Sequence, residues 1–355
     1  MSLEQILLQH PDPYLHKTWG ELKIVEQFLA TPQHIAIRLN LPYPAADIQA
    51  ELLDPVRTKL QAASGIADIR FDLSWRIDAR ACQPGVLPIT GVKNVIAVAS
   101  GKGGVGKSTT AVNLAVALSV AGARVGLLDA DIYGPNQPQM LGVTQPIVPE
   151  SKSIPPVWAH GIQTMSMGYL VAAETPMVWR GPMVSSALQQ LARETAWDPL
   201  DYLLIDMPPG TGDIALTLAQ KIPVSGAVLV TTPQDIALLD VRKGLEMFKK
   251  VSIPLLGVIE NMSVHVCEAC GHASPIFGEG GAEALSQACG VALLGQLPLA
   301  RSIRTHADAG VPIVIAEPTS AIAEQYRTVA RKIAIQLLNR PKSYASKFPK
   351  IVRET

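Results

Sequence analysis

The residues with the clearest chemical meaning stand at positions 101–109, which read Gly-Lys-Gly-Gly-Val-Gly-Lys-Ser-Thr. The run fits the pattern G-x-x-x-x-G-K-[ST], in which backbone N–H groups of a glycine-rich loop surround phosphate groups. An apolar segment, Val95–Ala99, precedes the loop and a helical pattern follows it, so the loop would open a helix whose N-terminus attracts anions. We expect Lys107 to reach the β- and γ-phosphates and the Ser108 hydroxyl to bind Mg²⁺. The sequence therefore predicts a site for a nucleoside triphosphate.

A second template fits part of the same loop. Gly101, Gly103 and Gly106 match G-x-G-x-x-G, and Asp129 lies about where a dinucleotide-binding fold places its ribose-binding acid. A phosphate-binding loop requires a lysine and a serine at the start of the helix, whereas a dinucleotide fold does not, so we favour the former. The expected nucleotide-binding residues of the loop are Gly101, Lys102, Gly103, Gly104, Val105, Gly106, Lys107, Ser108 and Thr109.

Two aspartates stand where apolar runs end. Asp129 follows Val125–Leu128, and Asp206 follows Tyr202–Ile205. A strand that finishes in aspartate places a carboxylate beside the phosphate loop, where Mg²⁺ is held directly or through water. The alternative for each is a solvated aspartate or a helix N-cap. We expect Ser108, Asp129 and Asp206 to form the Mg²⁺ site.

Three residues are candidates for catalysis. Asp131 is expected to orient or activate the attacking water, and Lys107 to contact the phosphates. Lys102 is a second lysine on the same loop, and we expect it to reach the nucleotide of a partner subunit, as an arginine finger does. The stretch 208–213, Pro-Pro-Gly-Thr-Gly-Asp, is typical of a rigid turn ahead of a helix and is suited to sensing the γ-phosphate.

The pair Cys267 and Cys270 is the second feature with chemical meaning. A C-x-x-C pair can chelate a soft metal, run thiol–disulfide exchange or do neither, and all three alternatives stay open. A closed zinc site needs four ligands, for which only His265 and His272 are nearby. An iron–sulfur cluster also takes four thiolates, which a symmetric dimer would supply by bringing two pairs together on its axis.

The composition narrows the classes of function. With 30 basic and 30 acidic residues among 355 and only 5% aromatic residues, the chain lacks the positive charge and the stacking surface of a nucleic-acid-binding protein. No apolar run of about 18 residues predicts a transmembrane helix, and Met1–His10 lacks the pattern of a secretory signal. The four cysteines are spaced too unevenly for a disulfide framework. We therefore expect a cytoplasmic protein that binds neither nucleic acid nor membrane.

The pattern of hydrophobic residues changes along the chain. Residues 1–80 combine short alternating segments with one helical stretch, which predicts a small α+β domain. Residues 81–92 are rich in proline and glycine and are expected to be a linker. Residues 93–340 alternate continuous apolar runs with helical segments, which predicts an α/β P-loop NTPase domain with a doubly wound, mostly parallel sheet. Residues 341–355 are expected to be a solvated tail. The apolar runs are Val95–Ala99, Val125–Leu128, Tyr202–Ile205, Ala227–Val230 and Leu255–Ile259.

A series of motifs in a fixed order gives the chain a family resemblance. They are residues 101–109, 128–135 (Leu-Asp-Ala-Asp-Ile-Tyr-Gly-Pro), 179–183 (Trp-Arg-Gly-Pro-Met), 206–213, 231–235 (Thr-Thr-Pro-Gln-Asp), 260–263 (Glu-Asn-Met-Ser) and the cysteine pair. On these motifs, residues 91–338 closely resemble the Mrp/ApbC family of P-loop iron–sulfur cluster carriers. Lys102 has the position of the signature lysine of the deviant Walker A class, which includes MinD, ArsA and the nitrogenase iron protein.

The resemblance implies a cytoplasmic homodimer that binds and slowly hydrolyses ATP with Mg²⁺. It implies a transferable [4Fe–4S] cluster held between subunits by Cys267 and Cys270, with cluster scaffold proteins and apo iron–sulfur proteins as partners. By the same analogy, Asn261 would contact adenine. Residues 1–80 resemble the small domain often fused to these carriers, and Asp12-Pro13-Tyr14-Leu15 is similar to its Asp-Pro-Glu-Leu motif. The stretch Leu41–Ala45, however, lacks the cysteine that this domain often holds.

Two other functions stay open. A MinD-like positioning ATPase with a structural zinc loop would need a C-terminal amphipathic helix, which residues 342–355 do not supply. A cluster-bearing reductase similar to the nitrogenase iron protein would also use a dimer-bridging cluster, but its cysteines lie far apart in sequence rather than as C-x-x-C. A reductase would keep its cluster while it cycles between redox states, whereas a carrier would release it.

Overall fold

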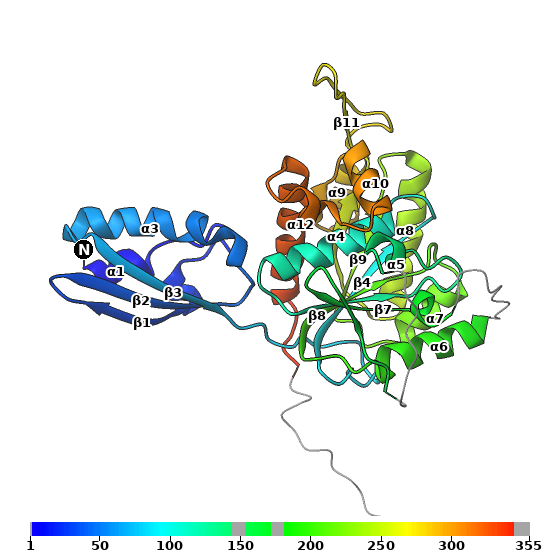
Figure 1. Cartoon of the computed structure of the whole chain (residues 1–355), viewed down its shortest axis with the longest axis horizontal. Coiled ribbons are helices and arrows are strands. Elements are labelled where there is room, and N and C mark those ends of the chain that lie inside the picture. Colours follow the sequence, from blue (N-terminus) through cyan, green and yellow to red (C-terminus); the bar gives the residue numbers. More distant parts are fainter. Residues whose placement is uncertain (1, 144–152, 172–180, 344–355) are drawn as a thin grey trace, which may run out of the picture. The chain divides into compact units, whose positions relative to one another are not determined.

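The computed structural model describes residues 2–143, 153–171 and 181–343. Contacts within the chain divide it into two compact units (Figure 1). The smaller unit comprises Met1–Asp78 with Val120–Gly122, and the larger comprises Ala79–Ser119 with Ala123–Thr355. Both candidate sites belong to the larger unit.

The smaller unit is a three-stranded sheet with helices. β1 and β2 are antiparallel, whereas α3 connects β2 to a parallel β3. Apolar residues of β2 are buried at every second position, the alternation expected of a sheet with one covered face. The unit is therefore α+β, as its sequence pattern predicts. Its elements are α1 (Leu3–Leu8), α2 (Trp19–Leu22), β1 (Val25–Ala30), β2 (His34–Leu41), η1 (Ala46–Ile48), α3 (Gln49–Ser64) and β3 (Asp68–Trp75).

Two segments singled out by the family resemblance meet in this unit. Asp12 is 1% exposed, and its Oδ1 accepts hydrogen bonds from the backbone N–H groups of Tyr14 (2.9 Å) and Leu15 (2.8 Å). Its Oδ2 accepts a 2.6 Å bond from the hydroxyl of Tyr43, which lies in the stretch without the family's cysteine. Because a buried carboxylate needs hydrogen-bond donors, these contacts give both segments a structural role.

The larger unit contains, among the described residues, one eight-stranded sheet in the order β13-β10-β9-β4-β8-β5-β7-β6. All of its pairings between described strands are parallel except that of β6 with β7. Every residue of β5 and β8 is buried, as strands between two helical layers must be. The strands are β4 (Val92–Ser100), β5 (Val125–Asp129), β6 (Val157–Ala159), β7 (Ile162–Ser166), β8 (Leu200–Asp206), β9 (Gly226–Thr231), β10 (Leu255–Glu260) and β13 (Leu293–Gln296).

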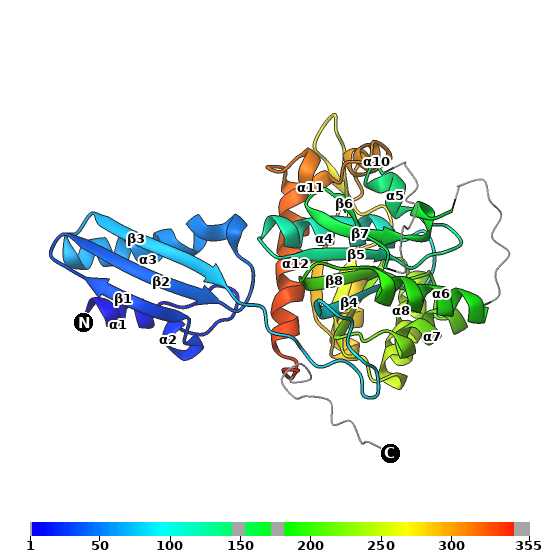
Figure 2. The same cartoon turned by 60° about the horizontal axis from the view of Figure 1, so that its bottom comes forward.

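Helices lie on both faces of this sheet. α4 (Lys107–Val120) and α12 (Ala321–Leu338) lie on one face, and α6 (Gly181–Glu194), α7 (Asp213–Lys221) and α8 (Asp235–Lys250) on the other (Figure 2). The prediction of a doubly wound, mostly parallel α/β fold is therefore confirmed. None of the helices in the described ranges has the length and hydrophobicity needed to cross a bilayer. The shorter elements are α5 (Gln137–Met140), η2 (Met167–Tyr169), α9 (Gly281–Cys289), α10 (Arg301–Asp308) and α11 (Ile313–Ala316).

The strand order places the candidate acids beside the phosphate loop. β8 pairs with β4 on one side and with β5 on the other. Asp206 and Asp129 are the last residues of β8 and β5 and are paired in register with each other. The phosphate loop begins after Ser100, at the end of β4. Because parallel strands end at one edge of a sheet, this topology gathers the three chain segments at the usual ligand-binding edge.

The segment predicted as a linker packs into the larger unit from Ala79 onward. Gln83 is 6% exposed, and its amide makes hydrogen bonds of 2.5–2.8 Å with three backbone groups at the end of α7. The start of the predicted tail is bonded to the start of the linker, since the Ala81 N–H donates to the Pro341 carbonyl oxygen (2.9 Å). Residues 344–355 of that tail, and Trp179–Arg180 of the family motifs, lie outside the described residues.

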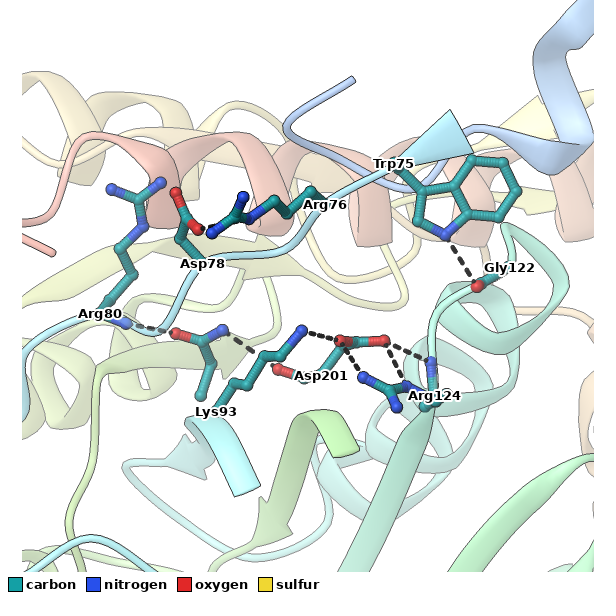
Figure 3. Close-up of polar contacts among 9 residues, drawn as sticks. Trp75, Arg76, Asp78, Arg80, Lys93, Gly122, Arg124 and Asp201 are labelled. Carbon is teal, nitrogen blue, oxygen red and sulfur yellow. Dashed lines mark hydrogen bonds and ion pairs between the residues drawn. The ribbon is translucent and has the colours of Figure 1, made fainter. Parts of the chain in front are cut away.

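A cluster of charged side chains lies at the end of the sheet where β4, β5 and β8 begin, opposite the phosphate loop (Figure 3). The Asp201 side chain, 8% exposed, lies at the start of β8 and accepts hydrogen bonds from Lys93 of β4 (2.8 Å) and from the guanidinium and backbone N–H of Arg124 before β5 (3.0–3.2 Å). Burial alone would raise the pKa of Asp201, but the bonds from Arg124 and Lys93 hold the pKa below its usual value. The carboxylate thus ties together the three strands that position the site.

We predict that Asp201→Asn lowers the free energy of unfolding by about 1.5–3 kcal/mol at pH 7, the range for hydrogen bonds to charged groups. Because its folded pKa is depressed, the carboxylate contributes stability above the unfolded pKa of about 3.9, and this is lost as pH falls through the folded value. The difference between wild type and variant should therefore be constant from pH 7 to 5 and shrink below about pH 4. Urea unfolding followed by tryptophan fluorescence measures it. Asp198→Asn, at an exposed site nearby, is the control; an equal loss there would contradict the assignment.

Candidate functional site

The phosphate-binding loop connects β4 to α4. Gly106 has a φ angle of +81°, a backbone conformation that other residues rarely adopt. The Ser100 hydroxyl donates a 2.9 Å hydrogen bond to the carbonyl oxygen of Lys102 and so fixes the first turn. α8 packs directly on the loop, since a Cβ at Gly101 would lie 2.4 Å from the carbonyl carbon of Asp240. Glycine is therefore required by backbone geometry at one position of the loop and by packing at another.

Lys107 and Asp206 form a buried ion pair between the start of α4 and the end of β8. Their side chains are 6% and 1% exposed, and Nζ of the lysine contacts Oδ1 of the aspartate directly. The same ammonium group donates a 3.2 Å hydrogen bond to the hydroxyl of Ser108. A buried charge needs a paired opposite charge, so each residue depends on the other. A group expected to bind phosphates and a group expected to bind Mg²⁺ are thus in contact.

Gln137 is a residue of this network that sequence reasoning missed. It is 1% exposed, and its Nε2 donates hydrogen bonds to Oδ2 of Asp206 (2.9 Å) and to the carbonyl oxygen of Ser108 (3.0 Å). Its backbone N–H donates to Oδ2 of Asp129 (3.2 Å). Its Oε1 is buried without a hydrogen-bond partner among the described residues. The one sequence signal was its place in the loop after Asp129, because no short motif assigns a role to a glutamine there.

Asp129, the last residue of β5, and Asp131, two residues after it, have environments that disfavour their ionised forms. Burial, and then the nearby charge of Asp206, raises the pKa of Asp129 to about 7. Asp129 also accepts hydrogen bonds from the Ser166 hydroxyl (3.1 Å) and from the backbone N–H of Asp131 (3.2 Å). Burial likewise raises the pKa of Asp131, against the opposing effect of Lys107. Carboxylates and hydroxyls are the oxygen ligands that hard divalent cations take, so the side chains of Ser108, Asp129 and Asp206 have the chemistry to hold Mg²⁺.

The outer part of the loop carries Lys102. This residue is half-buried, and its side chain makes no hydrogen bond or ion pair with any residue that the structure describes. Gly103 and Gly104 beside it are exposed, whereas Thr109 in the first turn of α4 is half-buried. An ammonium group to which the described residues offer no partner is available to an anion from outside the chain.

The turn after β8, expected to sense the γ-phosphate, is hydrogen-bonded to the residue just before the phosphate loop. The backbone N–H of Gly210 donates a 3.0 Å hydrogen bond to the carbonyl oxygen of Ser100. Gly210 has a φ angle of +88°, so a glycine suits this position. A change in the first turn of the loop would therefore act directly on the backbone that follows Asp206.

Asn261 also contacts the loop. It is 6% exposed, and its Nδ2 donates a 2.8 Å hydrogen bond to the carbonyl oxygen of Val105. A Cβ on Gly106 would lie 2.2 Å from the same nitrogen, so the close approach requires glycine. The adenine contact implied by the family resemblance would then fall to the Oδ1 atom of the amide. An adenine-binding role for Asn261 stays a prediction.

The cysteine pair lies on a small antiparallel hairpin of β11 (His265–Val266) and β12 (Ala273–Ser274). Figure 1 shows this hairpin projecting from the larger unit. Cys267 is half-buried and Cys270 is exposed, and both are free thiols. Hydrogen bonds from the backbone N–H groups of Cys270 and Ala269 lower the pKa of the Cys267 thiol. A lowered pKa favours the thiolate, which is the form that binds metals.

In the part of the chain that the structure describes, no third ligand stands beside this pair of thiols. Within the described residues, no group of three or more His, Cys, Asp or Glu side chains is placed to hold a metal ion. Nδ1 of His265 lies 3.1 Å from the carbonyl oxygen of Leu299, in hydrogen-bond contact with the backbone. The described part of the chain therefore forms no closed four-ligand zinc site by itself. An exposed ion pair between Glu268 and Arg301 (2.6 Å) ties the hairpin tip to α10.

The structure therefore gathers the predicted nucleotide and Mg²⁺ residues and holds the cysteines apart from them. Five of the predicted residues lie where the parallel strands end, and hydrogen bonds, an ion pair or mutual electrostatic effects link them. They are Lys107, Ser108, Asp129, Asp131 and Asp206. The two thiols lie on the hairpin that follows β10. The roles of all these residues stay predictions.

Comparison with known proteins identifies relatives over most of the chain. Residues 91–334 match the ParA family model described as NUBPL iron-transfer P-loop NTPase. An iron-sulfur cluster carrier protein of Pseudomonas fragi is 58% identical over 269 residues, covering 75% of this chain and 94% of the relative. An iron-sulfur cluster carrier protein of Escherichia coli K12 is 50% identical over 334 residues, covering 93% of this chain and 89% of the relative. Among solved structures, a nucleotide-binding protein from Archaeoglobus fulgidus in complex with ADP matches with a TM-score of 0.57 and 34% identity, covering 66% of this chain and 93% of that one.

The buried ion pair leads to a stability prediction. Lys107→Ala should lower the free energy of unfolding by about 3–5 kcal/mol, because it leaves the Asp206 carboxylate buried without its cation. Adding Asp206→Asn removes the unpaired charge, so the double variant should be more stable than Lys107→Ala alone. Denaturant unfolding of the two single variants and the double variant gives the coupling energy.

The control cycle uses the exposed pair Glu246 and Lys249, whose N–O distance is 2.9 Å. Its coupling should be about 0–0.5 kcal/mol, since exposed pairs in a helix contribute little. Additive effects at Lys107 and Asp206 would show that the two charges are not paired in solution.

Proposed function

This chain belongs to the NUBPL iron-transfer family of P-loop NTPases, and we propose that it is an ATP-dependent carrier that holds a transferable [4Fe–4S] cluster and delivers it to apo iron–sulfur proteins. One observation carries the proposal: a phosphate-binding loop with the predicted Mg²⁺ ligands beside it and a two-thiol hairpin occur in the same compact unit. Neither feature alone would separate a cluster carrier from a nucleotide switch or a thiol protein.

The nucleotide half of the function follows from the buried network. The loop N–H groups and Lys107 bind the phosphates of ATP, and Ser108, Asp129 and Asp206 hold Mg²⁺. The ammonium of Lys107 then exchanges its contact with Asp206 for the phosphates. Asp206 would then lie beside bound Mg²⁺, whose positive charge would take the place of the lysine. Asp131 orients the attacking water, and Lys102 reaches the nucleotide of the partner subunit.

The cluster half depends on a second copy of the chain. A [4Fe–4S] cluster takes four cysteine ligands, and each chain offers the pair Cys267 and Cys270. A two-fold axis through a homodimer would bring both pairs to one cluster. The lowered pKa of Cys267 and the exposure of Cys270 support ligation that solvent and acceptor thiols can reach.

The rest of the chain has a supporting place in this proposal. Residues 1–80 form a small domain without a ligating thiol, residues 81–92 connect it to the P-loop NTPase domain of residues 93–340, and residues 341–355 are a tail. The protein acts in the cytoplasm, where thiols stay reduced, and its partners are scaffold and apo iron–sulfur proteins rather than nucleic acid or membrane.

Two alternatives are weaker on specific grounds. A MinD-like switch with a structural zinc loop lacks four zinc ligands within the described part of one chain. A reductase would retain its cluster, whereas these thiols lie on an exposed two-ligand hairpin that favours exchange.

Anaerobic reconstitution with iron and sulfide tests the cluster site. Wild type should take up about four irons per dimer. Cys267→Ala and Cys270→Ala should each take up almost none, because symmetry removes two of the four ligands in the dimer. Both variants should still bind Mg-ATP, since the thiols lie outside the phosphate network. Iron, sulfide and nucleotide are measured on the same samples, and transfer to an apo-protein is then followed by its activity.

The other two cysteines provide matched controls. Cys82 and Cys289 are half-buried, and burial raises the pKa of Cys82. Their alanine variants should retain the cluster. Uptake of one zinc per chain without sulfide would instead identify a structural metal loop and refute the carrier function.

Mixing inactive variants tests whether Lys102 acts across the dimer. Lys102→Ala and Asp131→Ala should each bind ATP but hydrolyse it poorly. If Lys102 acts in trans, their heterodimer has one site with both groups intact. A 1:1 mixture should therefore regain about a quarter of wild-type activity, since half the dimers have one working site of two.

The control mixes Lys107→Ala with Asp131→Ala. Both of these residues serve the nucleotide of their own chain, so neither site of the heterodimer is complete and no activity should return. Absence of recovery in the Lys102→Ala mixture, with subunit exchange shown by mass spectrometry, would place Lys102 in cis.

A further inference from the structure

A short segment connects Asn261, which is hydrogen-bonded to the phosphate loop, to the cysteines. Residues 262–266 are all that separates Asn261, at the end of β10, from Cys267. Asn261 is fixed by two hydrogen bonds, from its backbone N–H to the Thr231 carbonyl oxygen (2.7 Å) and from its Nδ2 to the Val105 carbonyl oxygen (2.8 Å). The segment therefore starts from a residue that is attached both to the sheet and to the phosphate loop.

Asn261 contacts the peptide unit between Val105 and Gly106, whose N–H is among those expected to surround the phosphates. In a trans peptide the C=O and N–H point in opposite directions. The bond to the Val105 carbonyl oxygen therefore directs the N–H of Gly106 away from Asn261, to the other side of the peptide. The N–H groups of this loop are those that surround phosphates. A phosphate that binds the Gly106 N–H acts on the same peptide unit, and hydrogen bonds on the two sides of a peptide polarise one another.

The residue after Asn261 is held in an unfavourable backbone conformation. Met262 has a φ angle of +56°, which costs free energy for any residue with a long side chain. Its Cε would lie 3.6 Å from a Cβ on Gly106, so Met262 also approaches the loop. Such a conformation persists only where the contacts on both sides enforce it.

The far end of the segment is hydrogen-bonded to residues 297–299, which follow β13. The backbone N–H and the hydroxyl of Ser263 both donate 3.0 Å hydrogen bonds to the Leu297 carbonyl oxygen. The Leu299 N–H donates to the Val264 carbonyl oxygen (2.8 Å), and His265 forms a parallel bridge with Leu299. With both ends bonded and a bulky residue at the bend, the segment has little freedom to absorb a displacement.

We propose that Asn261 is a positioning residue that couples the nucleotide site to the thiols, so that a nucleotide bound at the phosphate loop changes the reactivity of Cys267 and Cys270. The coupling passes from the Val105–Gly106 peptide through the Asn261 amide and the clamped segment to the hairpin. The proposal rests on the proposed function for the identity of the two sites, and it adds the residue that joins them.

The test measures thiol alkylation in the full-length, cluster-free protein. Reaction rates of Cys267 and Cys270 with iodoacetamide are followed by mass spectrometry, without nucleotide, with saturating Mg-ADP, and with a slowly hydrolysed Mg-ATP analogue. Equilibrium titration of each nucleotide defines saturation. In wild type the rates should change about fivefold or more on nucleotide binding, the usual size of coupling between two sites. Cys82 and Cys289 should not respond.

Two variants remove the amide donor. Asn261→Ala deletes the side chain, and Asn261→Leu keeps a branched side chain of similar size without a hydrogen-bond donor. Both should bind nucleotide at a higher concentration, yet the rates of Cys267 and Cys270 should no longer change at saturation. A merely structural role would weaken nucleotide binding and leave the response at saturation intact.

Thr110→Ala is the matched control. The Thr110 hydroxyl donates a 2.9 Å hydrogen bond to the carbonyl oxygen of Gly106, so it also supports the phosphate loop, but it lies on α4, which does not lead to the hairpin. This variant should keep the response of the thiols to nucleotide at saturation.

The possible results separate the two proposals. Nucleotide binding without any change in wild-type thiol rates would overturn the coupling and leave the carrier function standing. A full response in the Asn261 variants, or a lost response in Thr110→Ala, would show that Asn261 is not the specific link. Loss of all nucleotide binding in both Asn261 variants would make the amide a binding residue and end the coupling proposal. A wild-type protein that binds no nucleotide would refute the proposed function and, with it, this inference.

Discussion

The buried contact between Lys107 and Asp206 is the interaction on which the organisation of the site depends. Two opposite charges removed from water are stable only when they are close together and their remaining polar atoms are satisfied. The sheet meets this condition because β8 lies between β4 and β5, which brings the end of β8 against the start of α4. Gln137 and the Ser108 hydroxyl supply the further hydrogen bonds. The strand order and the ion pair therefore stabilise each other.

The groups that satisfy these charges are also the groups that ATP and Mg²⁺ would use. The lysine faces an aspartate where it would face phosphates, and the carboxylates of Asp129 and Asp131, whose pKa values are raised by burial, lie where a cation would neutralise them. Binding of Mg-ATP would then replace the contact between Lys107 and Asp206 by contacts of Lys107 with phosphates and of Asp206 with Mg²⁺. Such an exchange limits the free energy lost by desolvation, since Lys107 and Asp206 are already buried and paired.

The cysteine hairpin differs from the nucleotide site because it is exposed and has few contacts with the rest of the unit. It is held by a few backbone hydrogen bonds and an exposed ion pair, and its thiols are accessible. Weakly enclosed ligands exchange more readily than buried ones, which suits a cluster that must leave. On the proposed function, the larger unit would combine a buried site for a nucleotide with an exposed site for a metal cargo, and the segment after Asn261 would join the two.

The sequence by itself determined the phosphate loop, the acids at the ends of β5 and β8, the parallel α/β fold and the closeness of Cys267 to Cys270. Each of these features depends on local residue types and spacing. It did not predict β7, since Gln163 and Thr164 are polar and yet buried, with their side chains bonded to the backbone of Asp198 and Val157. Only the tertiary structure decided that Lys107 meets Asp206, that Gln137 completes the network, and that Asn261 supports the loop. These contacts join residues far apart in the chain, and the packing of strands, which no local pattern encodes, brings them together.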